Sequence, residues 1–183
     1  MSTGPLLRRT GVDAEGRSWL IRPALDEDVA GLVRLRNAVT AEGDLVAAVP
    51  GERSILEESL ALDSLRHGGG LAIVVEAGGE LAGQLQVARR QGSYEGHAGD
   101  LSIALGAEHR GRGLGTALMG CALDWARAVR LRKICLAVFP GNERAIALYT
   151  HAGFEVEGRQ RAQIHAGGAD RDLLLMGLLL STV

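Results

Sequence analysis

The order of the predicted elements indicates an α+β fold, built as a mixed, mostly antiparallel sheet with helices on both faces. Short apolar runs that alternate with polar residues predict most of the strands, and Gly78-Gly79 between two of these runs favours a two-residue hairpin. A long amphipathic helix is expected between the strand-like segments 101–105 and 133–139. A strand, a helix and a strand in this order predict one parallel crossover, which should be right-handed.

The first half of the chain predicts a hairpin, two helices and a second hairpin. Asp13-Ala14-Glu15-Gly16 supplies the turn of the opening hairpin, so residues 1–17 are expected to form a hairpin or a partly disordered arm. Asp26 is well placed to cap the first helix. The expected segments are strands at 6–9 and 18–22, helices at 26–37 and 52–67, and strands at 71–76 and 81–89.

The second half predicts the crossover, a short helix and a final strand pair. Apolar residues recur at three- and four-residue intervals along 114–129, while Arg127 and Arg130 fall on the polar face. Gly153 is expected to close the short helix. The segment 171–180 is apolar enough to be a central strand or to cover another subunit, which allows a homodimer. The expected segments are strand 101–105, helix 114–129, strand 133–139, helix 142–149 and strands 159–165 and 171–180.

The composition indicates one globular unit that binds neither nucleic acid nor a membrane. The 183 residues are 46% hydrophobic and contain no flexible linker, so a single domain over residues 1–183 is expected. The net charge is −2 and the arginines are dispersed, which predicts binding neither to nucleic acid nor to an acidic membrane. No uninterrupted apolar stretch is long enough to cross a bilayer, and the polar start lacks the apolar core of a signal peptide. We therefore expect a cytoplasmic protein.

The cysteines and histidines predict neither a metal site nor a thiol nucleophile. Cys121 falls on the apolar face of a helix and Cys135 lies within an apolar strand, so both are expected to be small core residues. The five histidines lack paired ligand spacing, and each is expected at the surface. These histidines are His67, His97, His109, His151 and His165.

Residues 110–116 form a glycine-rich segment between a predicted strand and a predicted helix, and this placement suits phosphate binding. The segment reads Arg110-Gly111-Arg112-Gly113-Leu114-Gly115-Thr116. The first amides of the helix lack intrahelical partners, and the positive end of the helix dipole favours an anion. The glycines let a ligand approach the backbone, while the two arginines add charge and the threonine hydroxyl adds a donor. A diphosphate is the expected ligand.

Two familiar phosphate loops do not match this segment. A Walker loop needs Gly-Lys followed by Ser or Thr, and the segment contains no lysine. The dinucleotide fingerprint needs Gly-x-Gly-x-x-Gly, whereas the glycines here are Gly111, Gly113 and Gly115. A flexible turn with two solvated arginines is the alternative that the glycine pattern alone leaves open.

A second group of residues follows the strand-like segment 133–139. Pro140-Gly141 ends that strand, and Asn142 can cap the next helix. Tyr149 lies two helical turns after Asn142, so both side chains emerge on one face and can contact a long, thin ligand. Packing of Tyr149 on Phe154 as an ordinary core residue is the alternative interpretation.

Together these two segments resemble the GNAT superfamily of acyl-CoA-dependent N-acyltransferases. Arg-x-x-Gly-x-Gly at residues 110–115 resembles the coenzyme A motif of that family, and residues 142–149 with Gly153-Phe154 resemble its later helix, which carries Asn and Tyr in these places. The resemblance covers about residues 98–160 and implies a GNAT-like fold, with a slot for the pantetheine arm between splayed strands. The contacts that it implies for acetyl-CoA, the cosubstrate, are Ile103, Ala104, Leu105, Arg110, Gly111, Arg112, Gly113, Leu114, Gly115, Thr116, Asn142, Arg144 and Tyr149.

The resemblance also implies an N-acetyltransferase in which a primary amine attacks the thioester directly, in a ternary complex without an acyl-enzyme. Amide hydrogens near Ile103 and Leu105 would polarise the thioester, and Tyr149 would donate a proton to the leaving thiolate. Glu42 is the preferred general base, although acidic loop residues are more often only solvated. The alternatives are Glu95, His97, Asp100 and an ordered water.

Two other functions are left open by the sequence. A non-catalytic acyl-CoA-binding sensor or regulatory module would keep Arg110, Gly113 and Gly115 but would have no need of Tyr149 as a proton donor. A nucleotide-hydrolysing loop is a more distant interpretation. The acceptor is expected to be a small-molecule amine or a protein amine, because the predicted substrate loops carry both charge signs and select neither class. These loops are 39–53, 90–100 and 163–170.

Overall fold

The secondary structure comes from a computed structural model that describes residues 7–43, 54–166 and 168–180. The strands are β1 Arg9–Val12, β2 Ser18–Pro23, β3 Leu71–Ala77, β4 Glu80–Arg89, β5 Ala98–Leu105, β6 Lys133–Val138, β7 Glu155–Ala166 and β8 Ala169–Leu179. The helices are α1 Val29–Ala41, α2 Ile55–His67, α3 Leu114–Ala128 and α4 Glu143–His151, with 3₁₀ turns η2 Asp26–Asp28 and η3 Ala107–His109. No helix in these ranges is both long enough and apolar enough to span a membrane.

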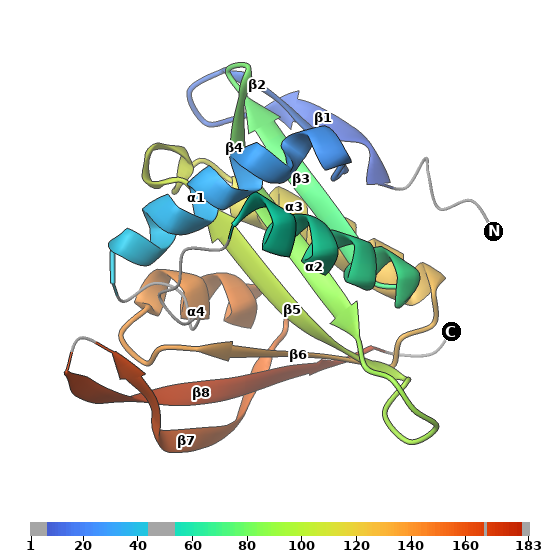
Figure 1. The fold of residues 1–183 in the computed structure, drawn as a ribbon, viewed down its shortest axis with the longest axis vertical. Helices are drawn as coiled ribbons and strands as arrows, with labels where there is room; N and C mark the ends of the chain where they lie inside the picture. Colours follow the sequence, from blue (N-terminus) through green and yellow to red (C-terminus); the bar gives the residue numbers. More distant parts are fainter. Residues whose placement is uncertain (1–6, 44–53, 167, 181–183) are drawn as a thin grey trace.

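The strands of the described ranges form one eight-stranded sheet in the order β1-β2-β3-β4-β5-β6-β8-β7 (Figure 1). All neighbours are antiparallel except β5 and β6, which pair in parallel through residues 98–100 and 133–135. β5 continues to Leu105 beyond this short ladder, and Figure 1 shows the two strands diverging there. The predicted sheet, mostly antiparallel with one parallel crossover through α3, is confirmed.

Alternation along β3 shows that helices cover both faces of the sheet. Ile73 belongs to the large core that includes Leu118 of α3, whereas Val74 belongs to a second cluster with Leu32 of α1 and Leu62 of α2. Successive residues of a strand point to opposite faces, so α1 and α2 lie on one face and α3 on the other (Figure 1). The short helix α4 shares the face of α3, because Tyr149 belongs to the same core. Helices on both faces were predicted and are confirmed.

The start of the first helix was predicted wrongly. Asp26 lies inside the 3₁₀ turn η2, and α1 begins at Val29. The buried carboxylate of Asp28 instead accepts a hydrogen bond from the Leu25 amide at 2.7 Å. Two hydrogen bonds from Arg22, of 2.6 and 2.8 Å, hold the Asp28 carboxylate in that position. A tertiary ion pair therefore decides where the chain turns into α1.

The second helix begins at Ile55 and has a local cap. The Ser54 hydroxyl accepts a hydrogen bond from the Glu57 amide at 3.2 Å, while the Glu57 carboxylate accepts one from the Ser54 amide at 2.8 Å. This reciprocal pair is a capping box, which satisfies two donors at the start of a helix. The predicted first residues of this helix, 52 and 53, lie outside the described residues.

The predicted strand pairs form, but the first strand of the opening hairpin is Arg9–Val12 and not 6–9, and the last strand is central. Gly78 and Gly79 have φ angles of 64° and 84°, which suit a two-residue hairpin turn with two left-handed positions. β8 lies between β6 and β7, so the apolar carboxyl-terminal segment is covered on both edges by strands. β5 and β7 begin earlier than predicted, at Ala98 and Glu155, because pairing with β6 and β8 extends them.

We expect the substitution Leu118→Ala to destabilise the fold by about 2–5 kcal/mol, because Leu118 is fully buried between α3 and the sheet and its truncation leaves a cavity. The matched control is Leu56→Ala on α2, where the side chain is 67% exposed and the change should stay within about 0.5 kcal/mol. Urea unfolding followed by circular dichroism measures both. Equal unfolding midpoints for the two variants would contradict the packing of α3 on the sheet.

Candidate functional site

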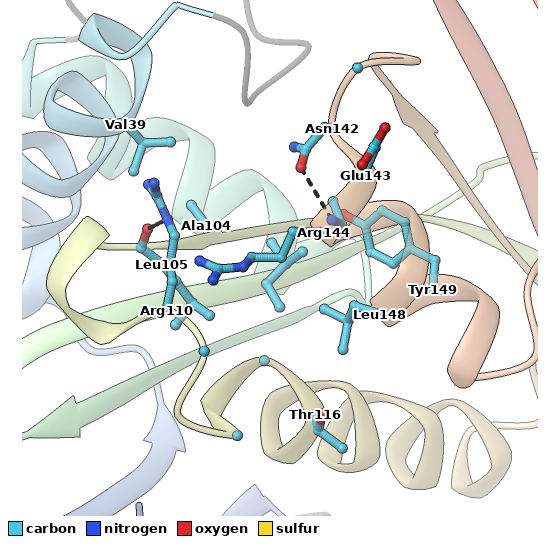
Figure 2. A pocket seen from close by; sticks show the side chains of 16 residues that line it. Val39, Ala104, Leu105, Arg110, Thr116, Asn142, Glu143, Arg144, Leu148 and Tyr149 are labelled. Carbon is cyan, nitrogen blue, oxygen red and sulfur yellow. Dashed lines mark hydrogen bonds between the residues drawn. The ribbon is translucent and has the colours of Figure 1, made fainter. Parts of the chain in front are cut away.

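A cavity of about 610 Å³ lies where β5 and β6 diverge (Figure 2). Its walls come from the end of β5, the glycine-rich segment, the start of α3, the first two turns of α4 and Val39 of α1. All of the residues predicted to contact the coenzyme line this cavity except Arg112 and Leu114. The cavity therefore brings together the two segments that the sequence singled out.

The glycine-rich segment 110–116, called the cradle below, turns sharply into α3. Gly111 and Gly113 have φ angles of 75° and 86°, a left-handed conformation that side chains rarely adopt, and Gly113 is the N-cap of α3. The Ala117 amide donates to the Gly113 carbonyl at 3.0 Å, so the amides of residues 114–116 have no acceptor within the helix. Because Gly113, Gly115 and Thr116 line the cavity, these donors and the positive end of the helix dipole lie beside it.

Gly115 serves close packing. A Cβ at Gly115 would lie 3.2 Å from Cδ2 of Leu148 and 3.4 Å from Cδ1 of Leu105. A side chain here would press on both neighbours, so glycine lets α3 approach α4 and the end of β5. This close approach places the cradle and the start of α4 on two walls of one cavity.

Arg110 is engaged by its neighbours. Its Nε donates to the Leu105 carbonyl at 2.9 Å, and its two terminal nitrogens donate to the Glu42 carboxylate at 2.5 and 2.8 Å. The hydrogen bonds from Arg110 outweigh the effect of burial and, with its charge, lower the pKa of Glu42. A lowered pKa makes a carboxylate a weaker base. Glu42 is also not among the residues that line the cavity, and its role as general base stays a prediction.

Arg112 and Leu114 lie outside the cavity wall. Arg112 forms an ion pair with Glu15 at 2.9 Å and lies 3.8 Å from the buried Asp13, both in the turn between β1 and β2. Leu114 is only 1% exposed and packs in the large core. The opening hairpin therefore contacts the cradle, which nothing in the local sequence indicated.

The first turns of α4 form the wall opposite the cradle. Asn142 is the N-cap of α4, as predicted, because its Oδ1 accepts a hydrogen bond from the Ala145 amide at 3.2 Å. Figure 2 shows Arg144 extended from this turn toward Arg110. Five lining residues were not among the predicted coenzyme contacts, although the first of them fell in the predicted substrate loop 39–53 and lies instead in α1. They are Val39, Gly141, Glu143, Ala145 and Leu148.

Helical spacing could have found part of this set. Ala145 lies three residues after Asn142, and Leu148 lies three residues after Ala145, so the three side chains follow one another along the helix surface. Val39 is distant in the sequence and was expected in a substrate loop, but it lies in the last turns of α1.

Tyr149 is both a core residue and a cavity residue. Its side chain is 7% exposed, and its ring packs on Phe154 with the centroids 6.0 Å apart and a tilt of 54°. It also lines the cavity (Figure 2). Burial raises the pKa of Tyr149 to about 12, so the phenol keeps its proton at neutral pH. The two interpretations of this tyrosine are therefore compatible.

The alternative bases lie away from the cavity wall. Asp100 accepts hydrogen bonds of 2.9 and 2.7 Å from Arg90, and Glu95 lies 3.4 Å from the same guanidinium. Neither these two residues nor His97 line the cavity. The carboxylate of Glu143 does line the cavity, at the start of α4, although the sequence analysis did not consider it as a base.

The cysteines are ordinary thiols, and one histidine was placed wrongly. Burial raises the pKa of Cys121 and of Cys135, so neither is a thiolate at neutral pH. His109 was expected at the surface but is only 6% exposed, in the turn η3 directly before the cradle. Its Nδ1 has no hydrogen-bond partner among the described residues. Within the same part of the chain, no group of three or more His, Cys, Asp or Glu side chains is arranged to hold a metal ion.

Comparison with known proteins places this site in a family. The sequence model of the Acetyltransferase (GNAT) family matches residues 41–154. Spermidine N(1)-acetyltransferase of Escherichia coli K12 is 32% identical over 104 residues, which are 56% of this chain and 55% of that protein. The L-methionine sulfoximine/L-methionine sulfone acetyltransferase of Pseudomonas paraeruginosa is 30% identical over 117 residues, which are 63% of this chain and 67% of that protein. The chain spans about half the length of the spermidine acetyltransferases that it matches.

A solved structure agrees with the sequence matches. The crystal structure of a GNAT-family acetyltransferase from Streptococcus pneumoniae has a TM-score of 0.81 and 30% identity, and the alignment covers 89% of this chain and 99% of that one. The family model spans more than half of the chain, and it includes both the cradle and the helix that carries Tyr149. The chain therefore belongs to the GNAT family of acetyltransferases.

Proposed function

We propose that this protein is an N-acetyltransferase that transfers an acetyl group from acetyl-CoA to a primary amine by direct attack in a ternary complex. The observation that carries the proposal is the single cavity that joins the cradle, at the start of α3, to the Tyr149 phenol across the gap between β5 and β6. A carrier that is charged at one end and reactive at the other needs such an arrangement. Acetyl-CoA, when bound, supplies the activated acetyl thioester.

The residues of the cradle fit a diphosphate. The amides of the first turn of α3 offer donors without acceptors in the helix, beside the positive end of its dipole. Glycine keeps the space open, because a Cβ at Gly111 would lie 3.4 Å from Nη2 of Arg144. A phosphate group needs donors and room at the same place, and the cradle provides both.

The unpaired edge of β5 fits an extended arm. Beyond Asp100 this edge has no strand partner among the described residues, and Ile103, Ala104 and Leu105 line the cavity along it. Backbone amides and carbonyls on a free edge pair readily with an amide-containing ligand. The amides near Ile103 and Leu105 are the proposed donors that bind the thioester oxygen.

Tyr149 is the proposed general acid. Its raised pKa, about 12, keeps the proton on Oη, where it can pass to the leaving thiolate. The ring is held by its packing on Phe154, which limits the directions in which the hydroxyl can point. The amine must lose a proton before attack, and either Glu42 or an ordered water is the proposed base.

The proposed acceptor is a small-molecule primary amine. The curated relatives are named for the acetylation of spermidine and of L-methionine sulfoximine or L-methionine sulfone, and these small molecules carry primary amines. A protein amine is the alternative acceptor. We further propose that the protein works in the cytoplasm, as expected from the sequence.

Binding of the coenzyme is expected to raise the melting temperature. Coenzyme A at about 100 times its Kd should add about 2.7 kcal/mol of stability, or roughly 5–10 °C for a chain of this size. ATP at the same concentration is the control and should have a smaller effect, because it lacks the pantetheine arm. Differential scanning fluorimetry measures the shift, and a larger shift with ATP would favour the nucleotide-hydrolysing interpretation.

Turnover is expected with at least one member of an amine panel. Polyamines, amino acids and a peptide amino terminus should be offered with acetyl-CoA while the release of free thiol is followed by its reaction with a chromogenic disulfide. Thiol release that depends on the amine supports the transferase. Coenzyme binding in the thermal assay without thiol release across the panel would favour the sensor.

The substitution Tyr149→Phe should lower kcat by about 10²–10⁴-fold and leave the Kd of coenzyme A nearly unchanged, because it removes only the proton donor. The matched control is Tyr94→Phe at the other tyrosine, which is 90% exposed and should keep full turnover. Since the pKa of Tyr149 is about 12, its deprotonation should not reduce kcat between pH 7 and about pH 10. Unchanged turnover in Tyr149→Phe would refute the acid role.

A further inference from the structure

The two arginines of the cradle have carboxylate partners. Arg110 donates two hydrogen bonds to Glu42, and Arg112 pairs with Glu15 at 2.9 Å while lying 3.8 Å from Asp13. Both arginine side chains are mostly buried, with exposures of 17% and 19%. Their positive charges are therefore already compensated before any ligand arrives.

A third arginine is placed differently. Arg144 lines the cavity, and its Nη2 lies 3.4 Å from the position that a Cβ of Gly111 would occupy. Figure 2 shows its side chain reaching from the start of α4 toward the cradle. Within residues 7–43, 54–166 and 168–180, Arg144 has no ion pair with a carboxylate. Among the described side chains, its guanidinium therefore lines the cavity without a carboxylate partner, next to the unpaired carboxylate of Glu143 in the same wall.

We infer that Arg144 is the guanidinium that recognises the diphosphate of the coenzyme, while Arg110 and Arg112 hold the shape of the cradle. This inference rests on the proposed function. A guanidinium can bind a phosphate through two parallel hydrogen bonds, which a single ammonium cannot reproduce. The guanidinium of Arg144 lies close to Gly111 in the same cavity as the start of α3, so a diphosphate in the cradle would be contacted from α4 as well as from the α3 amides.

Release of the cradle arginines to the ligand would be costly. Arg112 is 19% exposed, and its release would separate a mostly buried guanidinium from Glu15 and from the buried Asp13, which would keep only Arg17 as a cationic partner among the described residues. Arg110 also donates to the Leu105 carbonyl at the end of β5, and that bond would be strained by a large movement of the side chain. Arg144 reaches the cradle without breaking any such contact.

The ion pairs also explain how a glycine-rich loop keeps one shape. Gly111 and Gly113 permit the left-handed turns, but glycine has more conformational freedom to lose than any other residue. Arg110 ties the loop to the end of α1 through Glu42, and Arg112 ties it to the opening hairpin through Glu15. These two ion pairs keep the amides of α3 oriented for an anion before it binds, which raises the affinity for that anion.

Isothermal titration calorimetry with coenzyme A, dephospho-coenzyme A and pantetheine tests the assignment. The first two ligands carry the diphosphate and pantetheine does not. The substitution Arg144→Gln should raise the Kd of coenzyme A and of dephospho-coenzyme A by the same factor, about 10- to 100-fold, and leave that of pantetheine unchanged. Arg144→Lys should recover part of the loss. The matched control is Arg127→Gln, which removes one exposed arginine near the far end of α3 and should change none of the three constants.

The melting temperature of the ligand-free protein distinguishes the structural role of Arg110 and Arg112 from the ligand-binding role of Arg144. Arg110→Gln should lower it, because Glu42 then loses its arginine partner. Arg112→Gln should lower it less, because Arg17 still pairs with Glu15 and Asp13, and Arg144→Gln should not lower it. An unchanged Kd for coenzyme A in Arg144→Gln would overturn the inference and leave the proposed function intact. A loss limited to coenzyme A, with dephospho-coenzyme A unaffected, would also overturn it, since Arg144 would then contact the 3′-phosphate. Failure of the unaltered protein to bind coenzyme A would refute the proposed function itself.

Discussion

The separation of β5 from β6 is the constraint on which the rest of the site depends. The two strands pair only through residues 98–100 and 133–135, after which β5 stays with β4 and β6 stays with β8. The edge of β5 up to Leu105 then borders a cavity. The helices α3 and α4 pack closely next to the place where β5 and β6 separate, because Gly115 has no side chain to hold them apart. Rigid elements thus surround a slot with backbone donors on one side and helix amides at one end.

Charge pairing connects this slot to the first part of the chain. The cradle obtains its conformation from glycine, but its restraint comes from Arg110 and Arg112, which reach α1 and the opening hairpin. Both guanidinium groups are mostly buried, so moving either one away from its carboxylate is costly, and these contacts favour a single loop conformation. The amino-terminal hairpin and α1 therefore help to shape a site whose recognisable motifs all lie in the second half of the chain.

Burial gives Tyr149 two properties at once. Contact with Phe154 orients the ring, and removal of water from around the phenol stabilises its protonated form. A tyrosine on the surface would have neither a fixed direction nor a raised pKa. Helical spacing alone left open whether Tyr149 is a core residue or a proton donor. Its burial is compatible with both roles.

The sequence by itself determined the features that depend on residues close together in the chain. The hairpin at Gly78-Gly79, the amphipathic α3 and the glycine cradle at its start depend on short-range backbone preferences and periodicity, which neighbouring residues already contain. The partners of the charged side chains were decided only by the tertiary structure. Glu42 meets Arg110 across 68 positions, and Asp28 rather than Asp26 directs the start of α1 because Arg22 holds it. The first contact joins residues 68 positions apart, and the second joins the end of β2 to a 3₁₀ turn six positions later. Neither contact leaves a periodic signal in the sequence, because each depends on how the chain folds between its two partners.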